Sequence, residues 1–383
     1  MGFTSGVPQP HRGRSFMKLV IFGLSVSSSW GNGHATLWRG LCGALARRGH
    51  DVVFLERDVP FYADHRDLTE LPGGGQLILY SDWREALDRS RNHLAEADVA
   101  MVTSYCPDGV AASGLVLESP AQLKVFYDLD TPVTLSRLEQ GLPVDYIGPD
   151  GLGDFDLVLS YTGGRSLDGL RRRLGARRVA PLYGAVDPDI HKPVPADDRY
   201  RADLGYLGTY AADRQAALRE LFVEPARRRP HCLFLLAGSM YDGSFPWQPN
   251  IFFIDHLAPA SHPAFYCSSR LTLNVTRGSM AETGYCPSGR LFEATACGAP
   301  VLSDYWIGLE QFFEPGSEIL LAANTEEALA ALDRSPEALA RIGQAAREHT
   351  LAKHTSAIRA LELERILEEA CGRPSESAAL ETV

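Results

Sequence analysis

Glu293 is the residue whose chemistry raises the first functional question in this sequence. It follows Leu291 and Phe292 directly, within the stretch CPSGRLFEATACGAP at residues 286–300. An ionised carboxylate beside apolar side chains is costly unless a partner neutralises it or donates hydrogen bonds to it. A core helix would supply a neighbouring arginine, whereas a binding site would supply a ligand.

The residues just before Glu293 predict a helix N-terminus that binds an anion. Ser288 and Gly289 start the expected helix, and the sequence Gly-Ala-Pro ends it. The N–H groups and dipole at such a start favour a phosphate, and Arg290 adds a positive charge in the first turn. A diphosphate there would leave Glu293, one turn further, to accept hydrogen bonds from the vicinal hydroxyls of a ribose.

Two further segments are predicted to contact the same ligand. Gly208 and Thr209 follow an apolar run and would let the backbone approach a ligand closely. Arg214, near the start of the next helix, would reach the diphosphate or lie solvated on that helix. Asn274 ends the run before the loop that leads to Ser288, where it would bind the ligand or cap the turn.

The first half of the chain offers acid–base chemistry. The sequence GNGHA places Gly31 and Gly33 in a glycine loop and His34 at the start of a helix. Histidine titrates near neutral pH, so His34 suits a general base or a sugar contact, and it is equally consistent with a cap of its own helix. In VFYDLDTP we interpret Asp130 as a base or as a ligand for a substrate hydroxyl, and Asp128 as structural.

Charge and cysteine content narrow the class of protein. Lys and Arg total 37 against 48 Asp and Glu, and this formal net charge of -11 argues against nucleic acid as a partner. The seven cysteines lack the paired short spacings of zinc or redox sites, which favours a cytoplasmic protein with no metal and no cofactor. The Asp-x-Asp pattern recurs at residues 154–156 and 187–189, so we do not interpret Asp128 and Asp130 as metal ligands.

Two segments raise the question of membranes. Basic and apolar residues near the N-terminus resemble a signal peptide, but they continue into a strand, a glycine loop and a helix that form one unit. A second segment, RRRLGARR, is either a solvated helix face or a site of peripheral membrane contact. Its arginines are Arg171, Arg172, Arg173, Arg177 and Arg178.

Short apolar runs alternate with helix-period segments along the chain and predict an α/β fold with parallel sheets. Seven expected strands precede the segment VDPDIHKPVPADDRYRAD and six follow it, which predicts two doubly wound Rossmann-like domains facing across a cleft. The predicted boundaries are a disordered extension at 1–16, a first Rossmann-like domain at 17–185, a linker at 186–201, a second Rossmann-like domain at 202–354, a C-terminal helix at 355–371 that packs back toward the first domain, and a disordered tail at 372–383.

The segment LNVTRGSMAETGYCPSGRLFEATACGAPVLSDYWIGLEQFFEPGSEILLAANTEEALAAL, with HTLAKHTSAIRALELERIL after it, resembles the donor domain of GT-B glycosyltransferases. The resemblance is to the spore-maturation (CgeB-like) group and covers roughly residues 200–370. It implies that Glu293 binds the donor ribose and that Ser288, Gly289 and Arg290 lie at the diphosphate. Many retaining members place another glutamate eight positions earlier, where this chain has Tyr285.

These patterns together predict a metal-independent glycosyltransferase that moves a sugar from a nucleotide-diphosphate donor to an acceptor held by the first domain. Its acceptor, the base and sugar of its donor, and its stereochemical outcome stay open. Two alternatives also stay open: a nucleotide-sugar epimerase of the same fold, and a nucleotide-sugar-binding protein without catalysis, for which Tyr285 argues.

Overall fold

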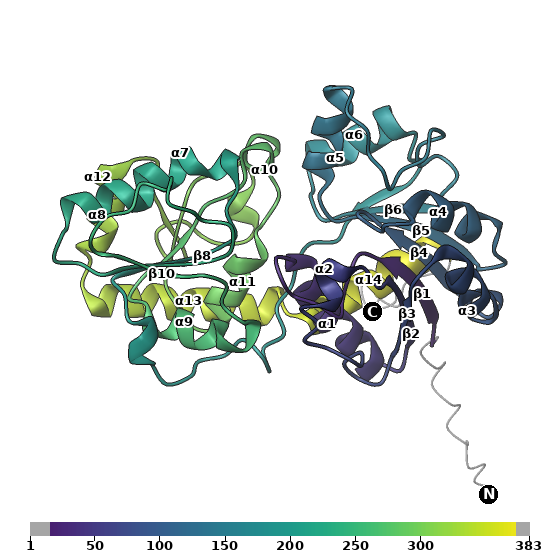
Figure 1. Ribbon diagram of the computed structural model, residues 1–383, viewed down its shortest axis with the longest axis horizontal. Coiled ribbons are helices and arrows are strands. Elements are labelled where there is room, and N and C mark those ends of the chain that lie inside the picture. Colours follow the sequence, from purple (N-terminus) through teal and green to yellow (C-terminus); the bar gives the residue numbers. More distant parts are fainter. Residues whose placement is uncertain (1–15, 373–383) are drawn as a thin grey trace, which may run out of the picture.

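The computed structural model describes residues 16–372, and the predicted disordered ends lie almost entirely outside them. Two α/β lobes lie side by side, and the chain passes from the first to the second and back again at its end (Figure 1). Each lobe holds one fully parallel sheet with helices around it, which is the two-domain α/β architecture that the alternating runs predict.

The first sheet has the strand order β3-β2-β1-β4-β5-β6-β7, and the second has the order β10-β9-β8-β11-β12-β13. The strands are β1 (Lys18–Gly23), β2 (Asp51–Arg57), β3 (Gln76–Tyr80), β4 (Val99–Thr103), β5 (Leu123–Asp128), β6 (Leu157–Ser160), β7 (Val179–Pro181), β8 (Leu204–Leu207), β9 (Phe234–Ala237), β10 (Ile251–Ile254), β11 (Thr272–Asn274), β12 (Val301–Ser303) and β13 (Leu320–Leu321). In each sheet the order reverses beside the first strand, where β1 meets β4 and β8 meets β11. Loops diverge at such a point and leave a crevice at the carboxyl ends of the strands.

The helices of the first domain connect successive strands. They are α1 (Gly33–Arg47), α2 (Pro60–Ala63), α3 (Trp83–Ala95), α4 (Gly109–Glu118), α5 (Thr131–Glu139) and α6 (Arg165–Leu174). In the second domain the helices are α7 (Gln215–Leu218), α8 (Glu224–Arg228), α9 (His262–Ser268), α10 (Gly278–Thr283), α11 (Gly289–Ala296), α12 (Thr325–Leu332) and α13 (Pro336–Lys353), and the last helix, α14 (Ser356–Ala370), returns to the first domain. Within residues 16–372 no helix is long and apolar enough to cross a membrane.

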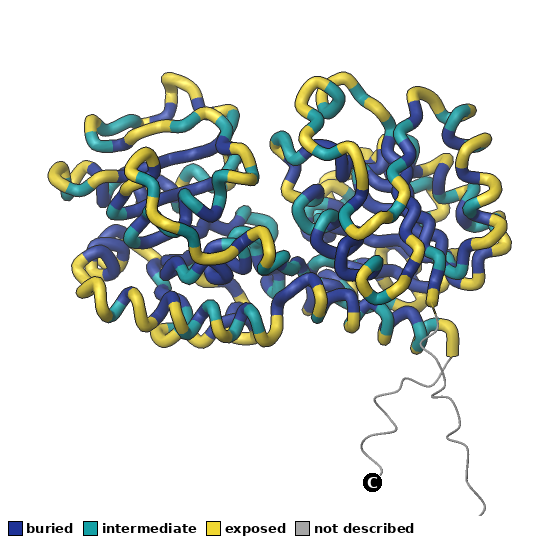
Figure 2. The backbone as a smooth tube through the Cα atoms, turned by 90° about the horizontal axis from the view of Figure 1, so that it is seen from below, coloured by how far each residue is buried: buried dark blue, intermediate teal, exposed yellow. Residues whose placement is uncertain are grey.

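The strands are buried in the middle of both lobes, and exposed residues concentrate on the outer helices and loops (Figure 2). Central strands such as β4, which reads VAMVT and is buried throughout, are continuous apolar runs because helices cover both faces of a parallel sheet. This pattern explains why the strands of this chain are recognisable from its sequence.

The chain crosses between the domains at one place. Val186, on the outward crossing, pairs with Thr355 on the return crossing in a parallel bridge. The Val186 N–H donates to the His354 carbonyl at 3.0 Å, and the Ser356 N–H donates to the Val186 carbonyl at 2.8 Å. Arg359 reinforces this pairing with two bonds to the Gly184 carbonyl, at 3.0 and 3.2 Å.

After the return crossing, α14 packs on α1 and completes the core of the first domain. Gly40 of α1 allows this close approach, because a Cβ there would lie 2.3 Å from the Ser356 hydroxyl oxygen. Glu364 of α14 pairs with Arg48 and, at 2.7 Å, with His50 Nε2. The C-terminal helix is therefore part of the first domain's packing.

A second contact between the domains lies beside the cleft. The Gly163 N–H donates to the Tyr285 carbonyl at 3.0 Å, and the Tyr161 hydroxyl donates to the Pro287 carbonyl at 2.9 Å. The Thr162 hydroxyl lies 3.1 Å from Cys286 Sγ. The segment that leads into α11 is thus held against the end of β6.

Leu363 of α14 is fully buried in the first domain's core, so Leu363→Ala should lower that domain's free energy of unfolding by about 2–5 kcal/mol. Leu361→Ala on the same helix is the matched control, because Leu361 is 47% exposed. Urea unfolding followed by tryptophan fluorescence measures both variants. Equal losses for the two variants would contradict the packing of α14 described above.

Candidate active site

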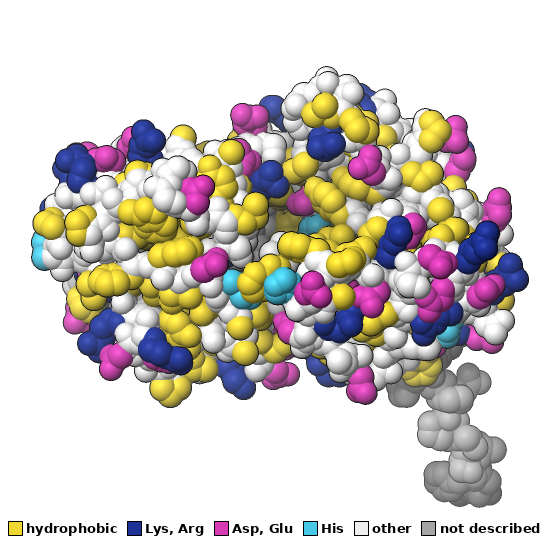
Figure 3. Space-filling model, in the orientation of Figure 1, with side chains coloured by type: hydrophobic (Ala, Val, Ile, Leu, Met, Phe, Trp, Pro, Cys, Tyr) yellow, Lys and Arg dark blue, Asp and Glu magenta, His cyan; other side chains and the backbone are white. Residues whose placement is uncertain are grey.

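A cavity of about 590 Å³ lies between the two domains, at the carboxyl ends of both sheets. Figure 3 shows the surface hollowed between the lobes, with histidine side chains near the hollow. The cavity brings together eleven of the residues singled out in the sequence. They are Gly31, Gly33, His34, Asp130, Gly208, Thr209, Arg214, Ser288, Gly289, Arg290 and Glu293.

The start of α11 forms the wall of the cavity on the second domain. Ser288 precedes the helix with an extended backbone, and its hydroxyl makes no capping hydrogen bond. Gly289 and Arg290 follow it in the first turn and also line the cavity. A helix N-terminus that opens into a cavity, with a hydroxyl beside it, is suited to an anion.

Arg290 is held in this wall by uncharged groups. Its Nε donates to the Leu207 carbonyl, its guanidinium donates to Asn274 Oδ1 at 3.0 Å, and it stacks 5.1 Å from the centre of the Tyr206 ring. Asn274 is not itself among the residues that line the cavity, so its predicted contact with the ligand is replaced by a bond to Arg290. Gly208 must stay small, since a Cβ there would lie 2.5 Å from the Arg290 guanidinium.

Two more arginines line the cavity near Arg290. Arg214 is largely buried, and burial lowers the pKa of its guanidinium, as do the charges of Arg290 and Arg277. Arg277 pairs with Asp213 at 3.3 Å. The three arginines outnumber the Asp213 and Glu293 carboxylates beside them, so this wall is positive on balance and suited to a ligand with more than one negative charge.

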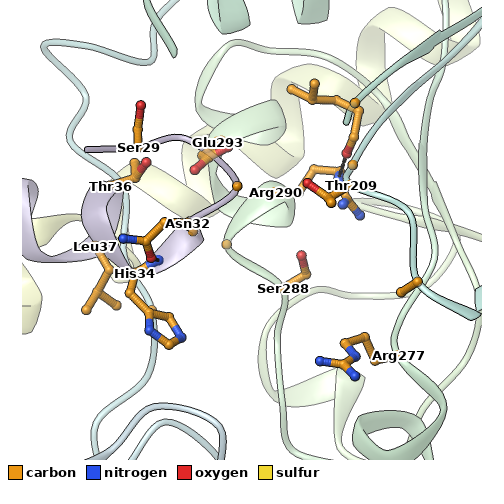
Figure 4. A pocket seen from close by; sticks show the side chains of 18 of the residues that line it. Ser29, Asn32, His34, Thr36, Leu37, Thr209, Arg277, Ser288, Arg290 and Glu293 are labelled. Atoms are coloured by element: carbon orange, nitrogen blue, oxygen red, sulfur yellow. Dashed lines mark hydrogen bonds between the residues drawn. The ribbon is translucent and has the colours of Figure 1, made fainter. Parts of the chain in front are cut away.

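Glu293 lies one turn beyond Arg290 in α11 and also lines the cavity (Figure 4). Its Oε2 accepts a hydrogen bond from the Tyr266 hydroxyl at 3.3 Å and lies 3.9 Å from His262 Nδ1. Its Oε1 faces Gly289, where a Cβ would lie 3.9 Å away. The carboxylate thus lacks the paired arginine that a purely structural role would supply, and it keeps acceptor capacity toward the cavity.

The opposite wall belongs to the first domain and contains His34 and Asp130. His34 Nε2 lies 3.5 Å from Asp130 Oδ2, and each side chain keeps 19% of its surface exposed. Asn32, rather than His34, caps α1, because its side chain accepts the His34 N–H at 3.1 Å. Figure 4 shows His34 across the cavity from Thr209 and Arg290. The imidazole is therefore free to act on a group in the cavity.

Tyr105 extends this pair. Its ring lies 5.8 Å from the His34 ring, and burial raises the pKa of its hydroxyl, as do the Asp130 and Asp128 carboxylates. The backbone of Tyr105 adopts a φ of 63°, which L residues rarely adopt. Asp128 lies behind, fully buried, and accepts the Asp130 N–H at 3.1 Å, which fits its structural interpretation.

The second domain matches a family model described as glycosyl transferase-like over residues 214–365. Sucrose-phosphate synthase from Thermosynechococcus elongatus superposes with a TM-score of 0.67 and 16% identity, over 92% of this chain and 98% of that chain. The chain has the GT-B fold, and its second domain is similar to glycosyl transferase-like proteins. The match confirms the resemblance to GT-B enzymes, whereas the narrower CgeB-like assignment stays a prediction.

Two other structures share this fold. Anabaena HepE in complex with UDP-glucose has a TM-score of 0.65 and 13% identity, over 92% of this chain and all of that one. An alpha-glucosyltransferase in complex with UDP and a 13-mer DNA has a TM-score of 0.68 and 12% identity, with the same coverage. No curated protein sequence matches the chain significantly.

The chain has Tyr285 at the position where many retaining GT-B enzymes place a glutamate. This residue has a φ of 50°, and its ring packs between the domains against Gly164 and Gly308, where added Cβ atoms would lie 2.3 and 2.4 Å from it. Tyr285 therefore acts as a spacer between the domains. Glu282, the nearest glutamate before it, is exposed and not among the residues that line the cavity.

Several residues of the cavity were not predictable from the sequence, because they lie in loops or, like His262, at the start of a short helix. Tyr105, His256, His262 and Arg277 all line the cavity. Arg277 had a usable signal, since it is a basic residue three positions after the end of β11. The Trp30 ring bridges the domains, lying 4.1 Å from the His65 ring and 3.8 Å from the His256 ring, and burial lowers the pKa of His256.

The arginine segment considered for membrane contact is mostly engaged in the protein. Arg171 pairs with Asp168, Arg173 with Glu139 and Arg177 with Asp154. Arg178 donates to the carbonyls of Glu369 and Ala370 in α14. This pairing reduces the positive field that an anionic membrane would meet, and it favours the solvated helix face.

Burial raises the pKa of Asp128 to about 6, above the usual value for an aspartate. The folded state therefore disfavours the charged carboxylate. The contribution of protonated Asp128 to the free energy of unfolding is fully present below about pH 4 and is lost as the pH rises through 6. Asp128→Asn should accordingly raise the free energy of unfolding by about 1–3 kcal/mol at pH 7.5, but have little effect at pH 4. Thermal unfolding at both pH values, with the exposed Asp154→Asn as control, measures this difference, and a gain independent of pH would contradict it.

Proposed function

We propose that this protein is a glycosyltransferase that transfers a sugar from a nucleoside-diphosphate sugar to a hydroxyl acceptor, with the donor on the second domain and the acceptor on the first. One observation carries the proposal: a single cavity places the arginine-rich start of α11 opposite the His34–Asp130 pair. UDP-sugars are the first donors to test, because HepE and the alpha-glucosyltransferase have UDP or UDP-glucose bound.

The donor's diphosphate would lie at the start of α11. The N–H groups there, Ser288 and Arg290 would bind its oxygens, and Arg214 and Arg277 would add positive charge around it. As the bond from the anomeric carbon to the diphosphate oxygen breaks, negative charge grows on that oxygen, and these fixed cations stabilise it. We propose that the transfer is metal-independent because the cations perform this role.

Glu293 would bind the ribose of the donor. In this pose its carboxylate accepts hydrogen bonds from vicinal hydroxyls, one helical turn from the diphosphate. Gly208 and Thr209 would let the same nucleotide pass close to the backbone. This assignment gives Glu293 the partner that its position beside Leu291 and Phe292 requires.

His34 would act as the general base for the acceptor. The acceptor oxygen bonds to the anomeric carbon, its proton passes to His34 Nε2, and the electron pair of the breaking bond leaves with the nucleoside diphosphate. Asp130 Oδ2, 3.5 Å from the same nitrogen, would stabilise the positive charge that the imidazole gains. The net charge of -11 argues against DNA as the acceptor, although the alpha-glucosyltransferase structure contains DNA.

Incubation with UDP-sugars, with and without a panel of hydroxyl acceptors, tests the function. A transferase should give slow donor hydrolysis alone and a new glycoside with its acceptor. Isomerised nucleotide sugar would instead identify an epimerase, and binding without any turnover would identify a non-catalytic protein. The anomeric configuration of the product, read by NMR, decides between inversion and retention.

Arg290→Ala should weaken binding of UDP by about 1.5–3 kcal/mol, the range for hydrogen bonds to a charged group, while uridine affinity changes little. Calorimetric titration of both ligands gives the comparison. Arg341→Ala, on an exposed position of α13, is the control. Equal losses for UDP and uridine would mean that Arg290 supports the wall without meeting the diphosphate.

His34→Gln should lower turnover by about a hundredfold or more and leave the affinity for UDP nearly unchanged, because the donor binds mainly to the other domain. His93→Gln, on α3 away from the cavity, serves as the control. Steady-state kinetics with the identified acceptor, together with calorimetry of UDP, separates the two effects. Full activity of His34→Gln would assign the base elsewhere.

A further inference from the structure

Two histidines, His191 and His262, lie close to the Glu293 carboxylate. His262 begins α9, His191 belongs to the linker between the domains, and Glu293 projects from α11. Each residue offers one atom that could bind a metal ion, and these three atoms lie within 4.8 Å of one another. The three residues come from separate parts of the chain, so the fold itself assembles this cluster.

The hydrogen bonding of His262 fixes which of its nitrogens faces Glu293. Its Nε2 lies 3.2 Å from the Leu257 carbonyl, which can only accept, so Nε2 carries the proton. Its Nδ1 therefore presents a lone pair, lies 3.9 Å from Glu293 Oε2 and is buried without a hydrogen-bond partner. Two lone-pair donors thus face each other, an arrangement that a cation between them would stabilise.

His191 completes the cluster from the other side. The side chain is 98% buried, since only 2% of the residue is exposed, and neither ring nitrogen has a hydrogen-bond partner. Its ring centre lies 6.2 Å from that of His262. An imidazole that is buried with both nitrogens unpaired is costly, and a bound ion would offset this cost.

We propose that His191, His262 and Glu293 form a binding site for a transition-metal ion of the Zn²⁺ type. Two imidazoles and a carboxylate are a known ligand set for zinc, which leaves a fourth position open. Ligand atoms of a tetrahedral zinc ion lie roughly 3.4 Å apart, whereas the three candidate atoms lie within 4.8 Å of one another, so side-chain movements of roughly 1–1.5 Å would bring them to that spacing. His262 and Glu293 line the cavity, so the fourth position would be reached from it.

The surrounding groups support coordination. The Leu257 carbonyl holds the His262 tautomer that leaves Nδ1 unprotonated, and the Tyr266 hydroxyl donates to Glu293 Oε2. Such outer hydrogen bonds orient the ligands of metal sites. Because His191 lies in the linker, a bound ion would tie the linker to α9 and α11. The site depends on these contacts alone and holds whether or not Glu293 also binds a ribose.

Titration of the chelator-treated full chain with Zn²⁺ by calorimetry, and with Co²⁺ by visible absorption, tests the site. We expect one tight ion per chain, the d–d bands of low-coordinate Co²⁺, and far weaker binding of Mg²⁺. His191→Gln, His262→Gln and Glu293→Gln should each weaken Zn²⁺ by at least about tenfold, whereas the exposed His231→Gln should leave it unchanged. Tyr266→Phe should weaken it less than loss of a ligand.

Circular dichroism and thermal unfolding identify which variants stay folded; UDP binding does not serve here, because Glu293 is also the proposed ligand of the ribose. Failure of the wild-type chain to bind Zn²⁺ or Co²⁺ would overturn the site, as would binding that the three folded ligand variants retain in full. Loss of metal binding in His231→Gln to the same extent would also overturn it. UDP binding by a chain that binds no metal would reject this site and leave the proposed donor site standing.

Discussion

The pairing of Val186 with Thr355 is the constraint on which the cleft depends. Both passages of the chain between the domains occur there, and backbone hydrogen bonds join them. The contact of Tyr285 with Gly163 and Gly164 is a second contact between the domains, beside the cavity. These backbone contacts, together with the stack of Trp30 on His256, help to set the distance between His34 and the start of α11.

The two walls of the cavity carry different charged groups. The second domain holds Arg290 with a carbonyl, an amide and a tyrosine ring, so that its charge stays available for a ligand. The first domain instead pairs a histidine with a carboxylate, which suits the movement of a proton. A reaction that displaces a diphosphate needs positive charge to bind the leaving anion and a base to take a proton from the attacking group. The two walls supply one of these each.

The sequence predicted best what depends on periodicity and on local rules. Buried parallel strands are apolar throughout, and Ser288 with the Gly-Ala-Pro sequence bounds α11 closely, since the helix runs from Gly289 to Ala296. Contacts between distant loops were not predictable in this way. Nothing local to Asn274 shows that it binds Arg290, and nothing local to Tyr285 shows that two glycines with positive φ accommodate its ring. The same limit applies to His191 and His262, which only the folded chain brings to Glu293.

The stacking of Trp30 between His65 and His256 has a consequence for observing motion. The covalent crossings lie at Val186 and Thr355, whereas this stack joins the domains without any covalent link. A rotation about the crossings would separate the Trp30 ring from the His256 ring and expose the indole to water. Indole emission shifts with its surroundings, so Trp30 is an intrinsic fluorescence probe of domain opening.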